Sequence, residues 1–372
     1  MRAPTVPPST PFPQTGDPGA FAASFERLAV GALLCLAVAS VAACGGQAQH
    51  ALKSQSMQEA ARAAASLAKE SASPEETAPP EAVVVRDSAQ PTPDNPSDNL
   101  EREVASRLSS PVALTQAWTQ VGPFTSYLAP DAVAGSDGGV DVVVHFHGAS
   151  LAEADWRSGV ELPVAIVNVS IPGYGVGPYR DAFADPARFR ALVDDVVARV
   201  GGAHVRRLGL IAWSAGYGAV QQVLADEESY PAIDTVVLLD GLHADYVDGS
   251  PDPRALAPFA RFAHDAAAGR KQMIVTHSSV VPGGYASTGE TASALLDDVG
   301  AERVEETRTN ARGMVEWYHA DQNGLHVRGF RGGDARDHLE QVHLVGDVMH
   351  AFVAPHWAQL DVLEERHVLA SR

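Results

Sequence analysis

The sequence has 372 residues, of which 45% are hydrophobic, so the chain is long enough for one large or two ordinary domains with a sizeable core. Its 46 acidic residues outnumber the 27 lysines and arginines and give a formal net charge of -19 at pH 7. Because a negative field repels phosphate backbones, the composition argues against nucleic acid as a partner.

An apolar run stands near the N-terminus, where Arg27 precedes the segment LAVGALLCLAVASVAAC. The run is short and alanine-rich for a membrane span but suits the core of a signal peptide, which we predict over residues 1–43 with an N-terminal extension. Its end, Val41-Ala42-Ala43-Cys44, resembles the lipobox of bacterial lipoproteins. The resemblance implies acylation of Cys44 and a lipid-anchored protein of the cell envelope, facing the periplasm or on the outer membrane. The alternative is an uncleaved anchor helix or a chance cysteine.

Residues 44–110 are dominated by Ala, Glu, Ser, Pro and Gln, with runs such as SASPEETAPPEA and QPTPDNPSDN. Few of these residues could fill a core, so we predict a low-complexity linker behind the lipidated cysteine that is disordered or partly helical, with residues 57–69 as the candidate for a short helix. Such a linker would hold the folded part away from a membrane surface. Cys35 and Cys44 are the only cysteines, and therefore no disulfide can cross-link the chain that follows.

From about residue 111 the pattern changes to apolar runs that alternate with amphipathic segments, which is typical of βα units around a parallel sheet. Buried strands are predicted over residues 140–146, 163–169, 207–213, 234–240 and 271–276. Helices are predicted between them, over residues 185–201, after Ser214, from Pro253, and from Ser287 to Gly300.

The C-terminal part does not continue the alternation of strand and helix. Residues 314–330 form either a hairpin that turns at residues 321–324 or one strand after a loop, and a final helix is expected over about residues 337–354. No internal repeat is visible. We therefore predict a single three-layer α/β/α domain with a mostly parallel sheet over residues 111–372.

Ser214 stands at the corner between a predicted strand and a predicted helix, in the segment LIAWSAGYGAV. Small residues surround it, as a nucleophile on a tight strand-to-helix turn requires, and the helix N-terminus favours developing negative charge. This corner resembles the nucleophile elbow, G-x-S-x-G, of the α/β-hydrolase superfamily, with Ala212 in place of the first glycine. An ordinary serine N-cap is the structural alternative.

The segment His145-Phe146-His147-Gly148-Ala149 follows an earlier predicted strand. It is similar to the HG oxyanion loop of many esterases and lipases. The resemblance implies that the backbone N–H groups of Ala149 and Ala215 form an oxyanion hole. A pair of histidines that only pack or position the loop is the alternative.

The resemblance also implies an acid and a histidine after the serine, in that chain order. His338 is the favoured base because it opens the final helix after a glycine-rich loop, and His343 is the alternative. The loop after residues 271–276, the usual place for the acid, has no carboxylate before Glu290. Asp240, at the end of the preceding strand, is therefore the predicted acid, with Glu290 and Asp245 in reserve.

These residues predict a serine hydrolase that cleaves a carboxylic ester, or a related acyl bond, through an acyl-enzyme. The expected substrate is a small-molecule or lipid-like acyl compound, with no cofactor. One alternative is a metal-dependent hydrolase that uses the His145 and His147 pair, with His277 at another strand end. The other is a non-catalytic binding lipoprotein that keeps the hydrolase scaffold.

Overall fold

The structure is a computed structural model, and it describes residues 96–108, 112, 114, 117–172 and 175–371. The predicted signal peptide, Cys44 and residues 44–95 of the predicted linker lie outside the described residues. Among the helices of the described part, none has both the length and the apolar character needed to cross a bilayer.

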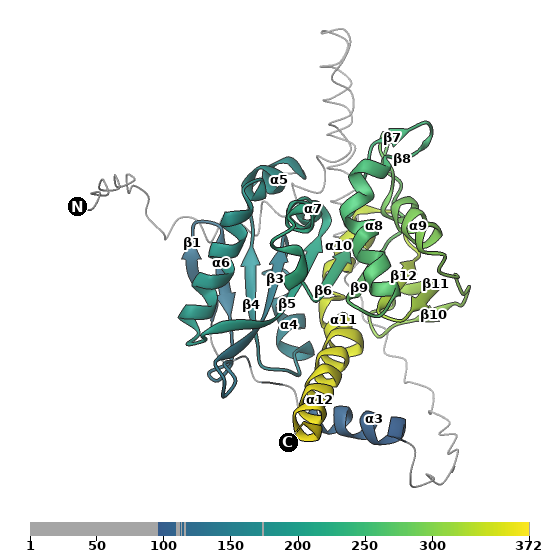
Figure 1. Cartoon of the computed structure of the whole chain (residues 1–372). Coiled ribbons are helices and arrows are strands. Elements are labelled where there is room, and N and C mark those ends of the chain that lie inside the picture. Colours follow the sequence, from purple (N-terminus) through teal and green to yellow (C-terminus); the bar gives the residue numbers. More distant parts are fainter. Residues whose placement is uncertain (1–95, 109–111, 113, 115–116, 173–174, 372) are drawn as a thin grey trace, which may run out of the picture. The chain divides into compact units, whose positions relative to one another are not determined.

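A ten-stranded sheet forms the centre of the domain (Figure 1). Its strand order is β1-β2-β4-β3-β5-β6-β9-β12-β11-β10. The six strands from β4 to β12 run parallel, and antiparallel strands occupy both edges. The bounds are β1 (Thr119–Gly122), β2 (Thr125–Leu128), β3 (Gly139–Phe146), β4 (Val164–Val169), β5 (His204–Trp213), β6 (Thr235–Leu239), β9 (Gln272–His277), β10 (Arg308–Thr309), β11 (Val315–Gln322) and β12 (Leu325–Phe330). A separate small ribbon pairs β7 (Tyr246–Val247) with β8 (Ser250–Pro251).

Helices cover both faces of the sheet, because the central strands are apolar on both sides. One face carries α5 (Gly177–Phe183), α6 (Pro186–Arg199), α7 (Tyr217–Ala225), α8 (Pro253–Ala267) and α9 (Thr288–Val299). The other carries α4 (Glu153–Gly159), α10 (Ala335–Val342), α11 (Val345–Val348), the π-helical turn η4 (Met349–Val353) and α12 (Ala354–Ala370). This arrangement confirms the predicted three-layer α/β/α architecture with a mostly parallel sheet.

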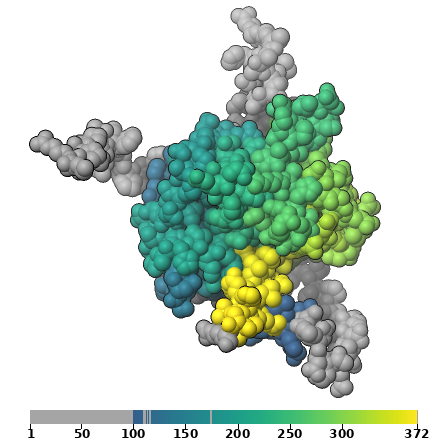
Figure 2. All heavy atoms as spheres, viewed as in Figure 1, coloured from purple at the N-terminus to yellow at the C-terminus, as the bar shows by residue number. Residues whose placement is uncertain are grey.

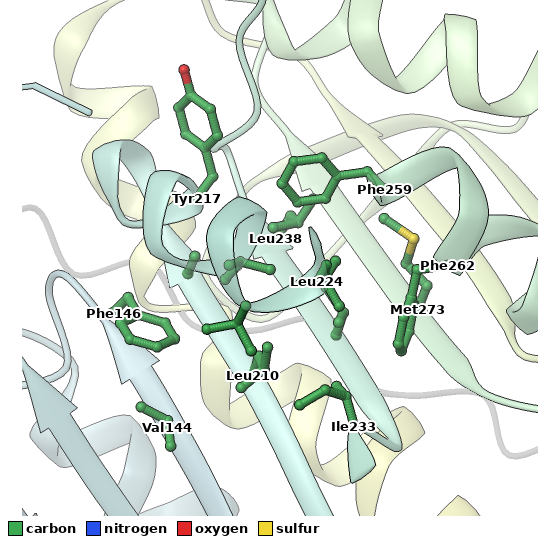
Figure 3. Close-up of a cluster of buried hydrophobic side chains, with 14 of the residues drawn as sticks. Val144, Phe146, Leu210, Tyr217, Leu224, Ile233, Leu238, Phe259, Phe262 and Met273 are labelled. Atoms are coloured by element: carbon green, nitrogen blue, oxygen red, sulfur yellow. The ribbon is translucent and has the colours of Figure 1, made fainter. Parts of the chain in front are cut away.

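The larger core lies between the sheet and the α5–α9 layer (Figure 3). Phe146 and Leu210 project from β3 and β5 toward it, while Phe259 and Phe262 project from α8. All four side chains are fully buried, and each such burial stabilises the fold by about 1.5–3 kcal/mol. This packing fixes the carboxyl ends of β3, β5 and β6, where the candidate site is built.

The predicted hairpin is confirmed, and the single-strand alternative is wrong. β11 and β12 pair antiparallel across a tight turn at Asn323 and Gly324, where Asn323 has a φ of 50°. Asparagine tolerates this left-handed conformation better than most residues, so the local sequence specifies the turn.

The final helix differs from the prediction. Instead of one helix over about 337–354, the chain forms α10, α11 and η4 in succession, and α12 continues to Ala370. The break lies where the chain crosses α4, because a Cβ on Gly346 would come within 2.8 Å of the carbonyl oxygen of Asp155. Close packing of two backbones, which spacing alone does not reveal, therefore divides the helix.

A further helix, α3 (Pro96–Arg107), lies in the range for which the sequence predicts a linker. It lies beside α12, and the two form ion pairs between Arg107 and Glu365 at 2.6 Å and between Arg366 and Glu103 at 2.8 Å. In Figure 2 the blue segment accordingly borders the yellow C-terminal one. Exposed pairs of this kind contribute about 0–1 kcal/mol each.

Candidate active site

Ser214 occupies a strained turn at the end of β5. The strand ends at Trp213, and a short 3₁₀ turn over Ser214–Gly216 leads directly into α7. Ser214 has a φ of 49°, which an L-residue adopts only when the surrounding structure imposes it. Gly216 is required next to it, because a Cβ there would overlap the carbonyl oxygen of Phe146 on β3. Ala212, the departure from the glycine pattern, is fully buried in the core beneath the turn.

The structure brings the three predicted residues Ser214, His338 and Asp240 together in one hydrogen-bonded row. Ser214 Oγ lies 2.9 Å from His338 Nε2, and His338 Nδ1 lies 2.8 Å from Asp240 Oδ2. A carboxylate only accepts, so Nδ1 carries the proton and Nε2 is free to accept the serine hydroxyl proton. Ser214 and Asp240 follow the adjacent strands β5 and β6, while His338 lies in the first turns of α10, which Asp334 caps.

Asp240 is 2% exposed and accepts four hydrogen bonds. Besides His338, the donors are the Ser278 amide at 3.0 Å, the Ser278 hydroxyl at 2.6 Å and the Thr288 hydroxyl at 2.6 Å. Burial by itself would raise the pKa of Asp240, but the bonds from His338, Ser278 and Thr288 outweigh it and hold the pKa at about 2. Sequence reasoning missed Ser278 and Thr288. The only hint of them in the sequence is that both are hydroxyl residues in the segment that follows β9.

Trp213 lies between two imidazoles. Its ring stacks on His338 with centroids 5.0 Å apart and on His147 with centroids 5.1 Å apart. Its indole N–H also donates to the main-chain carbonyl of His338 at 3.0 Å. The side chain next to the serine therefore fixes both the ring plane and the backbone of His338. The sequence motif gave no indication of this role, since the second position of the elbow admits any residue.

The predicted oxyanion loop follows β3 on the strand next to Ser214. Phe146 of β3 pairs in register with Ala212 of β5. Ala149 lies three residues after Phe146 and Ala215 three residues after Ala212, so both lie at the same edge of the sheet. His147 and Gly148 have φ values of 68° and 88°, which turn the chain sharply after the strand. The amide groups of two adjacent turns at a strand end can converge on one negatively charged oxygen.

Tyr179 fixes the side chain of His147. The tyrosine hydroxyl accepts from the Ile171 amide at 3.1 Å and lies 2.9 Å from His147 Nδ1. Since a fully buried hydroxyl needs an acceptor for its own proton, it donates to Nδ1, which leaves the His147 proton on Nε2. Burial, with a smaller contribution from the charge of His338, lowers the pKa of His147 to about 4. The imidazole of His147 is thus neutral at pH 7.

The alternative residues lie elsewhere. His343 Nδ1 bonds Asp155 at 2.7 Å, outside the row of hydrogen bonds around Ser214. Glu290 accepts from Ser287 in the capping box of α9, and Asp245 is exposed. The structure therefore joins none of the three to Ser214.

The side chains of His145 and His147 are not placed to bind one metal ion together. His145, inside β3, accepts a hydrogen bond from Trp156 at 3.3 Å, whereas His147 lies beyond the strand and bonds Tyr179. His277 bonds the carbonyl of Ser278 and the hydroxyl of Tyr318. In the part of the chain that the structure describes, no group of three or more His, Cys, Asp or Glu side chains could hold a metal ion.

Comparisons with known proteins give distant likenesses. No protein-family model and no curated protein sequence matches the chain. An esterase/lipase from an uncultured bacterium is similar in structure at 12% identity and a TM-score of 0.35, with 73% of this chain and 95% of that chain covered. A carboxylesterase from Bacillus subtilis gives 10% identity, a TM-score of 0.34, and coverage of 68% and 96%.

An uncharacterised protein from Capnocytophaga ochracea gives 15% identity and a TM-score of 0.37 over 61% of this chain. The present chain spans 59% of that protein. These likenesses are too distant to carry an argument about chemistry, which rests on the side chains described above.

Proposed function

We propose that the protein is a serine hydrolase that cleaves a carboxylic ester, or a related acyl bond, through an acyl-enzyme intermediate. The observation that carries the proposal is the continuous row from Ser214 Oγ to His338 at 2.9 Å and from His338 to Asp240 at 2.8 Å. A nucleophile, a base within hydrogen-bonding reach and a buried carboxylate that orients the base are what this chemistry needs.

In the first half-reaction, His338 Nε2 takes the proton of Ser214 Oγ as that oxygen attacks the substrate carbonyl carbon. The tetrahedral intermediate collapses, the carbon–oxygen bond to the leaving group breaks, and His338 returns the proton to the departing alcohol. In the second half, water attacks the acyl carbon, His338 accepts its proton, and the proton goes back to Ser214 as the carboxylic acid leaves. Asp240 stays ionised throughout and stabilises the imidazolium.

Charge develops on the carbonyl oxygen in both halves. We assign the amides of Ala149 and Ala215 as its hydrogen-bond donors, and the N-terminus of the turn that leads into α7 adds a favourable dipole. Loss of one such donor typically costs about 10²- to 10³-fold in kcat. The substrate that we expect is a small-molecule or lipid-like acyl compound.

We further propose that the enzyme is anchored to the cell envelope through lipid on Cys44, on the strength of the Val41-Ala42-Ala43-Cys44 sequence alone. Metabolic labelling with a radioactive fatty acid in a bacterial host tests this. Label on the wild-type chain and none on Cys44→Ser supports the anchor. Equal labelling of both chains, or of neither, contradicts it.

Hydrolysis of a panel of acyl esters of graded length tests the proposed activity. We expect Ser214→Ala and His338→Ala each to lower kcat/KM by at least about 10³-fold, while the matched His343→Ala keeps near wild-type activity. A fluorophosphonate probe should label wild type at Ser214 and leave Ser214→Ala unlabelled. A folded protein that neither labels nor hydrolyses any ester of the panel would favour the non-catalytic binding lipoprotein.

A further inference from the structure

His277 and Tyr318 form a buried polar pair that takes no part in the proposed reaction steps. The Tyr318 hydroxyl lies 2.6 Å from His277 Nε2, and His277 Nδ1 lies 2.7 Å from the main-chain carbonyl oxygen of Ser278. A carbonyl oxygen only accepts, so Nδ1 carries the proton. Burial lowers the pKa of His277, which keeps the ring neutral at pH 7, and Nε2 therefore accepts the tyrosine proton.

The pair is built across three neighbouring strands. β11, β12 and β9 lie side by side (Figure 1), and Tyr318, Gly329 and His277 are aligned in register on them. A Cβ on Gly329 would overlap the Tyr318 ring. The tyrosine therefore reaches the histidine two strands away only because the residue between them has no side chain.

On its other side, His277 holds the residue that supplies two of the donors to the acid. Ser278, whose carbonyl accepts from Nδ1, donates to Asp240 through its amide at 3.0 Å and its hydroxyl at 2.6 Å. The carbonyl and the amide belong to one residue, so a shift of the first moves the second. The imidazole thus fixes the direction of both donors.

The remaining donor besides His338 also depends on this imidazole. Thr288 at the start of α9 donates its hydroxyl to Asp240 at 2.6 Å, and Gly289 follows it. A Cβ on Gly289 would lie 3.3 Å from Cε1 of His277, which is closer than ordinary van der Waals contact. The first turn of α9 therefore packs directly on the histidine ring, and the ring sets how near Thr288 comes to the carboxylate.

We infer that His277 and Tyr318 are positioning residues for the acid, which hold Ser278 and Thr288 against Asp240 and so keep the carboxylate directed at His338. The inference rests on the proposed function, because Asp240 orients a base only if His338 acts as one. A buried carboxylate stays ionised through the donors around it, and three of the four donors here depend on the pair.

Hydrolysis of para-nitrophenyl acetate by the full chain tests the inference. We expect Tyr318→Phe, which removes one hydroxyl, to lower kcat about 3- to 5-fold, and His277→Leu, which removes both ring nitrogens, to lower it about 10- to 30-fold. KM should stay unchanged, since neither residue contacts the substrate. His277→Asn should restore most of the activity lost in His277→Leu, because its side-chain amide can still donate to the Ser278 carbonyl.

Tyr230→Phe is the matched control. Tyr230 is also buried, and its hydroxyl donates to Asp265 at 2.7 Å, but it precedes β6 and so lies at the opposite end of that strand from Asp240. The substitution removes the same atom as Tyr318→Phe and should leave kcat at the wild-type value.

A double-mutant cycle with Asp240→Ala separates positioning from a general effect on the fold. A pair that acts through the carboxylate has nothing to position in that background, so Tyr318→Phe should then change kcat by less than about 2-fold. An equal loss with and without the Asp240 carboxylate overturns the inference. Wild-type kcat in both Tyr318→Phe and His277→Leu overturns it as well.

Hydrogen exchange of the Ser278 amide tests the same contacts without turnover. This N–H is bonded to Asp240, and we expect it to exchange at least about tenfold faster in Tyr318→Phe than in wild type or Tyr230→Phe. Unchanged exchange in both Tyr318→Phe and His277→Leu contradicts the inference whatever the activity. Faster exchange in a chain that hydrolyses no ester contradicts the proposed function instead and leaves the support of Asp240 by the pair standing.

Discussion

The imidazole of His338 is held on its edges and on one face. Asp240 and Ser214 bond its two nitrogens, while Trp213 covers one face and binds the carbonyl of the same residue. During the proposed reaction this ring becomes positively charged. An indole face stabilises such a cation by about 0.5–2 kcal/mol, so Trp213 should act as a positioning residue.

Replacement of Trp213 separates its two contacts with His338. Trp213→Phe keeps a stacked ring and loses the N–H donor, whereas Trp213→Leu loses both. We expect kcat to fall about 3-fold in the first and about 10- to 30-fold in the second, with KM little changed. Ester kinetics measure the split. A parallel rise of KM in both variants would contradict a positioning role.

Asp240 holds the proton of His338 on Nδ1, which an amide at the same position can no longer do reliably. We expect Asp240→Asn to lower kcat by about 10²- to 10⁴-fold while Ser214 stays in place. Single-turnover assays with an activated ester measure this. The control is Ser278→Ala, which removes one of four donors to the carboxylate and should cost less than about 10-fold. Equal losses in both variants would mean that the network, and not the carboxylate, supports the imidazole.

At the scale of elements, the central strands were predictable because each is a short apolar run whose side chains are buried on both faces of the sheet. The breaks from α10 to α12 were not, since they depend on the contact of Gly346 with α4. The same distinction holds at the site. Chain order and strand ends pointed to Ser214, Asp240 and His338, but the bonds of Ser278 and the stacking of Trp213 arise only once distant segments meet.

The junction of β5 and α7 tolerates no added side chain at Gly216, whose Cβ would overlap β3. We expect Gly216→Ala to destabilise the fold by about 3 kcal/mol or more and to displace Ser214. Chemical denaturation and ester hydrolysis measure the two effects. Gly177→Ala at the start of α5 is the matched control, because nothing lies within 4 Å of its Cβ, and it should be neutral or slightly stabilising. Wild-type stability of Gly216→Ala would contradict the close approach.

β3 also carries a buried titratable group. Burial lowers the pKa of His145 from 6.5 to about 3, so the unfolded chain binds a proton below pH 6.5 that the folded chain does not. Stability is therefore complete above pH 6.5 and falls as the pH drops toward 3.

This group should account for part of the acid sensitivity of the fold. We expect His145→Asn to reduce the slope of the unfolding free energy against pH by about 1.4 kcal/mol per pH unit between pH 4 and 6. Urea denaturation at several pH values measures the slope. His367→Asn, at an exposed position of α12, should leave it unchanged, and equal slopes in all three proteins would contradict the assignment.

The charge of the whole molecule should discriminate among substrates. With a formal net charge of -19, the protein repels anionic esters at long range, and salt screens this repulsion over about 10 Å at 0.1 M and about 3 Å at 1 M. We expect kcat/KM for an ester that carries a carboxylate to rise severalfold between 20 mM and 500 mM NaCl. The methyl ester of the same compound serves as the neutral control. A salt response shared by both compounds would trace the effect to the enzyme and not to repulsion.

The hydroxyl of Ser214 and the imidazole of His338 are separated by 124 positions of chain. During synthesis, Ser214 therefore leaves the ribosome well before His338. The base that we assign to Ser214 thus belongs to α10, and a fragment that ends ahead of α10 keeps the serine but lacks that imidazole. The proposed reaction therefore requires the chain to be folded as far as its C-terminal helices.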